Sequence, residues 1–126
     1  ELVLSHSAKS SSVLVISLGC ATIPTNPPIG CEDSKIYAIK PTFDIVMSVA
    51  ITSVRVLAST NPTQYKLAHE SAQAAAALLL KDPISLSGLT DNLILNIMSP
   101  LLGLIPIDHV LSKCDREIIA KWFLMI

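Results

Sequence analysis

The sequence predicts an α+β fold, with short strands in the N-terminal half and about three helices in the C-terminal half. Two observations lead to this prediction: Val- and Ile-rich runs fill the first half of the chain, and helix start signals appear only after Asn61. Strands gathered ahead of helices are typical of α+β proteins rather than of alternating βαβ units. A mainly α-helical chain is the alternative. Because 126 residues is the size of one ordinary domain, we expect residues 1–126 to form a single domain.

The first 35 residues are interpreted as two strands followed by a stiff loop. The runs at 1–5 and 13–18 are rich in Val, Leu and Ile, and a polar linker separates them. The next segment contains Pro24, Pro27 and Pro28, which fix φ and favour extended geometry in the preceding residues. We therefore expect an extended loop between the two Gly-Cys steps that end at Cys20 and Cys31.

The segment 43–58 supports two interpretations. Every odd position from Phe43 to Ile51 is apolar, which is the alternation of a strand, and β-branched residues are dense. However, Asp44, Ser48 and Thr52 are spaced i, i+4 and i+8, as on one face of a helix. We take a strand as the expectation and a helix as the alternative.

The clearest helix signal begins at Asn61, which is a good N-cap. Pro62 occupies the first helical position, and Gln64 is placed to complete a capping box. The predicted helix ends at Asp82-Pro83, and its apolar face consists of Tyr65, Ala68, Ala72, Ala75, Ala76 and Leu79. The small alanine side chains predict close packing against another element.

Two further helices are predicted beyond residue 86. Thr90 or Ser87 is placed to cap a helix that runs through Met98 and is disturbed at Pro100 and Gly103. Ser112 and Asp115 form a capping box ahead of a C-terminal helix whose apolar residues are Ile118, Ile119, Trp122 and Phe123.

The composition favours a protein whose surface is covered by a partner. Hydrophobic residues make up 51% of the chain, charged residues only 15%, and the mean hydropathy is +0.58. We therefore expect a homo-oligomer or a larger assembly. A membrane-associated small subunit is the second alternative, although charged, amide or proline residues interrupt each long apolar stretch. Nine Lys and Arg residues, scattered singly against ten Asp and Glu, disfavour a nucleic-acid partner.

The C-terminal residues are the predicted interface. Five consecutive apolar residues, 122–126, need a cover at a position where a chain end is normally solvated. Aromatic residues are common anchors of interface cores, so Trp122, Phe123 and Ile119 are assigned an interface role. Docking of this segment within its own chain is the alternative.

Cysteines and histidines form no recognised catalytic or metal-binding pattern. Three widely spaced cysteines indicate free thiols and a reducing compartment. A Cys20–Cys31 disulfide and a metal tetrad of Cys20, Cys31, His109 and Cys114 are alternatives. His6, His69 and His109 are isolated, and close ligand pairs do not occur. We expect no metal and no cofactor.

One stretch resembles a family of enzymes. "VISLGCATIP" at 15–24 is similar to the strand ending in Leu-Gly-Cys of aspartate, glutamate and hydantoin racemases, and residues 39–57 are similar to the strand and helix that follow. The resemblance implies a cofactor-independent cysteine enzyme in which the Cys20 thiolate moves a substrate α-proton. The family uses a second cysteine in an equivalent strand-end context, and neither Cys31 nor Cys114 occupies one.

A second resemblance concerns architecture. Residues 54–82 look like the strand-to-helix passage of small coat proteins of single-stranded RNA phages, which have about this length and exchange helices across a dimer. It implies an assembly or coat-like subunit. The leading expectation is therefore a non-enzymatic, self-associating structural or interaction protein, with the Cys20 enzyme and the membrane-associated subunit as alternatives.

Overall fold

The computed structural model describes residues 22–89 and 91–126, and these residues are helical and lack a β-strand. The elements are α2 (Lys35–Ala38), α3 (Lys40–Thr60), α4 (Pro62–Lys81), a 3-10 helix η1 (Leu86–Gly88), α5 (Asn92–Ile97), α6 (Ser99–Leu102) and α7 (Lys113–Phe123). One isolated antiparallel bridge joins Ser85 to Val110. The α+β prediction is therefore wrong, and the mainly α-helical alternative fits. The expected strands at 1–5 and 13–18 lie outside the described residues.

The strand expected at 43–58 is instead part of α3, and the misleading signal has a physical cause. One face of the helix buries Phe43, Met47, Ala50, Ile51 and Val54 at spacings of three and four residues. A second face carries Ile45, Val49 and Val56, which are exposed. Residues of the buried face and of the exposed face alternate along the sequence from 43 to 51, and both sets are apolar. Together they give the every-second-residue pattern that is typical of a strand. β-branched residues are tolerated here because burial against other helices outweighs their weak helix propensity.

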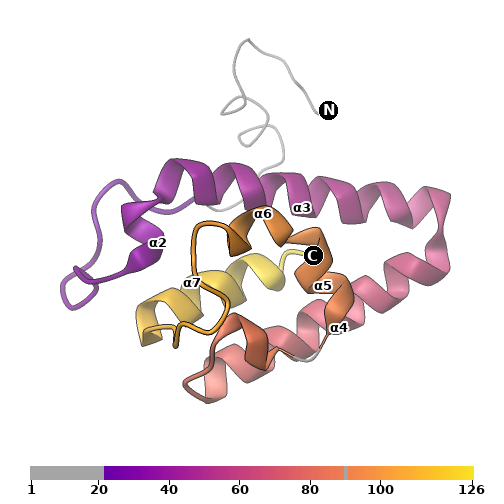
Figure 1. Cartoon of the computed structure of the whole chain (residues 1–126). Coiled ribbons are helices and arrows are strands. Elements are labelled where there is room, and N and C mark those ends of the chain that lie inside the picture. The colour runs from indigo at the N-terminus through magenta and orange to yellow at the C-terminus, as the bar shows by residue number, and fades with distance from the viewer. Residues whose placement is uncertain (1–21, 90) are drawn as a thin grey trace, which may run out of the picture.

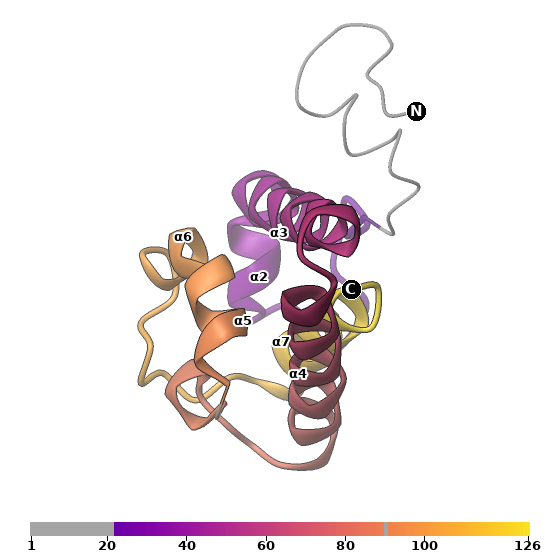
Figure 2. The same cartoon turned by 90° about the vertical axis from the view of Figure 1, so that its right-hand side faces the viewer.

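The helices α3 and α4 form an antiparallel hairpin joined at Asn61 (Figure 1). As predicted, the Asn61 side chain caps α4 by accepting a hydrogen bond from the Gln64 backbone N–H at 3.2 Å, and α4 ends before Asp82. The predicted alanine face is buried, and α3 packs against α4. From the turn the two helices diverge, and α7 lies between their open ends (Figures 1 and 2).

The segment 91–102 is interrupted, as the prolines and glycines predict. Asp91 caps α5 through its side chain, which accepts from the Ile94 N–H at 3.0 Å. Of the two predicted caps, Ser87 lies in η1 instead, and Thr90 lies outside the described residues. The helix stops at Met98, and α6 begins again with Ser99 and Pro100. The predicted cap of α7 is confirmed, because the Ser112 hydroxyl accepts from the Asp115 N–H at 3.1 Å.

The core forms where α7 packs along α4 and below α3. Trp122 is 1% exposed and meets Phe43 of α3 edge to face, with ring centroids 6.2 Å apart. A polar contact adds to this packing: the Arg116 guanidinium, in the first turn of α7, donates from Nη1 to the Leu79 carbonyl of α4 at 2.7 Å. The start of α7 is thus held to the end of α4 by a hydrogen bond, and the end of α7 is held to α3 by aromatic packing.

Replacing Trp122 with alanine tests this packing. We expect Trp122→Ala to lower the free energy of unfolding by ~3–5 kcal/mol, because a large buried side chain is lost and a cavity remains. Leu124→Ala, two residues away at a side chain that is 52% exposed, should change it by less than ~1 kcal/mol. Urea unfolding followed by circular dichroism measures both. Equal stability of the two variants would contradict the placement of Trp122.

Candidate functional site

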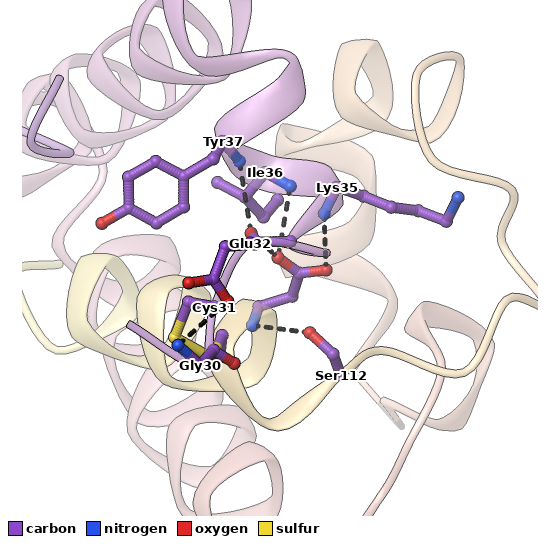
Figure 3. The surroundings of a disulfide bond; sticks show 10 residues. Gly30, Cys31, Glu32, Lys35, Ile36, Tyr37 and Ser112 are labelled. Atoms are coloured by element: carbon purple, nitrogen blue, oxygen red, sulfur yellow. Dashed lines mark hydrogen bonds between the residues drawn. A yellow bond between two sulfur atoms is a disulfide. The ribbon is translucent and has the colours of Figure 1, made fainter. Parts of the chain in front are cut away.

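The most elaborate polar arrangement in the described structure joins the start of α2 to the start of α7. We call it the α2–α7 clamp and define it as the Cys31–Cys114 disulfide together with Ser34 and Asp115. The two cysteines are 83 positions apart in sequence, and their Cα atoms are 5.8 Å apart. Figure 3 shows the disulfide beside the first residues of α2 and the Ser112 cap of α7.

The disulfide corrects three sequence-based expectations about the cysteines. Cys31 and Cys114 are bonded to each other, so the expectation of free thiols is wrong for both. Cys31 does not pair with Cys20, and neither Cys31 nor Cys114 is free to serve in the metal tetrad. With two of three cysteines oxidised, the argument for a reducing compartment also loses its basis, since such bonds persist mainly in oxidising environments.

Asp115 is the polar centre of the clamp. Its side chain is 1% exposed, and it accepts hydrogen bonds from the Lys35 N–H at 3.1 Å and the Ile36 N–H at 3.2 Å. It also accepts from the Ser34 hydroxyl. These two N–H groups belong to the first turn of α2, where no intrahelical carbonyl is available. The carboxylate therefore caps α2 while its own backbone N–H is capped by Ser112.

Ser34 completes the cap of this very short helix. Its hydroxyl oxygen accepts from the Tyr37 N–H at 3.2 Å, and its own N–H donates to the Cys31 carbonyl at 3.0 Å. Gly30, with φ of +93°, makes the preceding turn in a backbone conformation that side chains with a Cβ rarely adopt. The local sequence predicted the Ser112–Asp115 capping box, but it contained no signal that the carboxylate reaches across 80 residues to α2.

Small hollows flank the disulfide. One of about 170 Å³ is lined by Pro28, Tyr37, Ile118 and the disulfide, with Glu117 and Lys121 at its edge. A second, of about 190 Å³, is lined by the disulfide, Gly30 and Lys113. A third, of about 210 Å³, is bounded by the segment 22–24, Tyr37 and Trp122. Each is below the ~300–1,000 Å³ typical of small-molecule sites.

The predicted interface residues lie inside the chain. Trp122, Phe123 and Ile119 are all buried in the core, with exposed fractions of 1% or less. This placement agrees with the alternative in which the C-terminal segment packs within its own chain. The final residue is also held internally, because the Ile126 carbonyl lies 3.2 Å from Nδ1 of His69.

The other candidate residues do not assemble into a reactive centre. Cys20 and His6 lie outside the described residues. His69 stacks on Tyr65 with ring centroids 5.9 Å apart, and the His109 backbone N–H closes a turn by donating to the Pro106 carbonyl. Among residues 22–89 and 91–126, no group of three or more His, Cys, Asp or Glu side chains is arranged to hold a metal ion.

A second surface of interest runs along the outside of α3. Ile45, Val49 and Val56 are 41%, 51% and 53% exposed, and Thr52 lies between them. We call these four residues the outer stripe. In both views α3 forms an edge of the helical body (Figures 1 and 2).

Comparisons with protein-family models, with curated proteins and with solved structures found no match for this chain.

The disulfide should contribute strongly to stability because it closes a long loop. We expect the double variant Cys31→Ser/Cys114→Ser to lose ~2–4 kcal/mol of unfolding free energy and to melt roughly 10–20 °C lower. Cys20→Ser, which leaves both bonded cysteines in place, is the control. Differential scanning calorimetry with and without a reductant measures the effect. If reductant does not lower the melting temperature of the wild type, the bond has no stabilising role.

Asp115→Ala should destabilise the protein without touching the disulfide. We expect a loss of ~2–4 kcal/mol, because two buried N–H groups and a hydroxyl lose a charged acceptor. Glu117→Ala, an exposed carboxylate on the same helix, should cost less than ~0.5 kcal/mol. Chemical denaturation of both variants under non-reducing conditions gives the comparison, and a small effect of Asp115→Ala would contradict its role as the cap of α2.

Proposed function

We propose that this chain is a non-enzymatic, self-associating structural or interaction protein. The observation that carries the proposal is the apolar surface left after folding. The following ten large hydrophobic side chains in the described residues remain substantially exposed: Ile29, Ile45, Val49, Val56, Leu67, Leu80, Leu104, Ile107, Val110 and Leu124. With only 15% charged residues, the surface has few groups to separate them. Where such side chains gather on one face, as Ile45, Val49 and Val56 do on α3, they mark a surface for protein or membrane contacts.

The clamp supports a structural role because its polar groups are already used. The Asp115 carboxylate is buried and accepts from three donors, and the two nearest sulfur atoms are bonded to each other. A catalytic carboxylate or thiol needs a free position toward a substrate. In the clamp these donors and acceptors are hydrogen-bonded to one another, and they hold α2 against α7.

The racemase alternative is weakened by the same bond. The family that the segment at 15–24 resembles uses a second cysteine, and the two other cysteines of this chain, Cys31 and Cys114, are bonded to each other. This would leave Cys20 alone to carry the reaction. We infer an oxidising compartment for the same reason, in place of the reducing compartment suggested by cysteine spacing.

The membrane alternative has one feature in its favour. By length and composition α3 could cross a bilayer, but 44% of its most apolar window is buried inside the protein. The core helix of a globular protein passes the same test, and removal of α3 would take Phe43 and Met47 out of the core and uncover Trp122. We therefore propose association with protein rather than insertion into a membrane.

Size-exclusion chromatography with light scattering tests the proposal. We expect the mass to rise from 13.5 kDa at micromolar concentration toward twice that value or more as the concentration approaches the millimolar range. The rise should persist at high salt, because the contact is apolar rather than ionic. A constant 13.5 kDa throughout would show that the chain does not self-associate.

A further inference from the structure

We propose that the outer stripe of α3 is the contact surface between two copies of this chain. The inference rests on the proposed self-association and names its surface: Ile45, Val49, Thr52 and Val56. It commits to a second copy as the partner, with the two α3 helices packed against each other along the stripe.

The spacing of the stripe is that of a helix-pair seam. Successive positions are four, three and four residues apart, which is the spacing of alternating d and a positions in a two-helix contact. In this phase Val49 and Val56 occupy a positions, where β-branched residues favour two-stranded pairing. Small neighbours on the same side, Ser53 and Ser59, allow close approach of the second helix.

Three hydroxyls in or beside the seam are already hydrogen-bonded within α3. The Thr52 hydroxyl donates to the Ser48 carbonyl at 2.9 Å, and the Thr60 hydroxyl donates to the Val56 carbonyl at 2.8 Å. The Ser59 hydroxyl also donates to the Val56 carbonyl, at 3.3 Å. Covering these hydroxyls with a second helix therefore leaves no donor without a partner, which removes the main cost of burying polar groups.

The charge pattern suits a surface that meets its own copy. In a two-fold symmetric contact every charge is presented by both partners, so an interface free of charge avoids self-repulsion. The stripe has none. Lys40 and Asp44 of α3 neutralise each other through an ion pair of 2.9 Å, and Arg55 can extend its guanidinium away from the seam.

The distribution of side chains around α3 also points to a covered outer face. Asp44 and Ser48 lie on the buried side, 8% and 2% exposed, while Val49 and Val56 face outward. Asp44 Oδ1 and Ser48 Oγ have no hydrogen-bond partner among the described residues. A helix that buries polar atoms and exposes valines is unusual for a chain that works alone, but a second helix on the outer face makes α3 a helix buried on both sides.

The size of the contact predicts low affinity. The outer stripe runs from residue 45 to 56, ~17 Å along α3. The area that it can bury is therefore small and belongs with weak, transient interfaces of less than ~1,200 Å². We therefore expect a dimer with a dissociation constant on the order of 100 μM. A lipid surface is a less suitable partner, since helices that lie on membranes carry Lys- and Arg-rich polar faces and α3 has one lysine and one arginine.

The experiment compares two substitutions of equal exposure on the two long helices. Val49→Glu places a carboxylate in the seam of both copies, whereas Leu67→Glu adds the same group on α4, and both positions are 51% exposed. Analytical ultracentrifugation of the full chain under non-reducing conditions gives the dissociation constants. We expect Val49→Glu to weaken the dimer at least about tenfold and Leu67→Glu to change it by less than about threefold. Circular dichroism and melting temperature confirm that each variant is folded.

If Val49→Glu does not fold, Val56→Glu, at a stripe position that is 53% exposed, replaces it. A wild-type dimer that both α3 variants leave intact would overturn the stripe as the contact while self-association stands. A wild-type chain that stays monomeric would overturn both this inference and the proposed function. Flotation of that monomer with phosphatidylcholine vesicles, lost in Val49→Glu, would assign the stripe to a lipid surface instead of a second copy.

Discussion

The structure depends on the joining of two segments that are far apart in sequence, the loop before α2 and the start of α7. α2 has only four residues, too few for an isolated helix to be stable. It persists because the Asp115 carboxylate caps its first turn and because Ile36 is buried in the core. The Cys31–Cys114 bond fixes the same contact covalently. Once α2 is held, the chain enters α3 in the orientation that places Phe43 against Trp122.

The local signals in the sequence predicted helix ends well. Asn61 and Ser112 cap their helices as expected, because an N-cap acts on backbone groups two or three residues away and can be recognised from neighbouring residues alone. The buried alanines of α4 also follow directly from helical periodicity. Such features require no knowledge of the rest of the fold.

What sequence reasoning missed was set by distant parts of the chain. The segment 43–58 was interpreted as a strand because α3 is apolar on two faces, and only its packing partners reveal which face is inside. The contact between Asp115 and Ser112 was predicted correctly. The Asp115 carboxylate, however, accepts hydrogen bonds from the start of α2, 80 residues earlier in the sequence. Cys31 and Cys114 are separated by 83 positions. Because the chain has three cysteines, an odd number, the sequence was interpreted as containing free thiols rather than a disulfide. The interface role of Trp122, Phe123 and Ile119 stays a prediction, and the structure shows that these side chains are buried within their own chain.

The functional account follows from how the polar and apolar groups are divided. The buried carboxylate and two of the three cysteines are used to hold the fold, while uncharged apolar side chains remain on the outer side of its longest helix. The clamp fixes α2, which directly precedes α3, to the start of α7. α3 is therefore held in a defined orientation and can present a rigid surface. We therefore regard the clamp as the structural condition for the proposed association.

Mapping of the cysteines in the unreduced protein tests this account most directly. Free thiols are alkylated before tryptic digestion, which yields the peptide 10–35, containing Cys20 and Cys31, and the peptide 114–116, containing Cys114. The account predicts that mass spectrometry finds these two peptides crosslinked, with fragment ions placing the alkyl group on Cys20 and the bond on Cys31. Alkylation of all three cysteines, or a bond that includes Cys20, would contradict the clamp and the fold that depends on it.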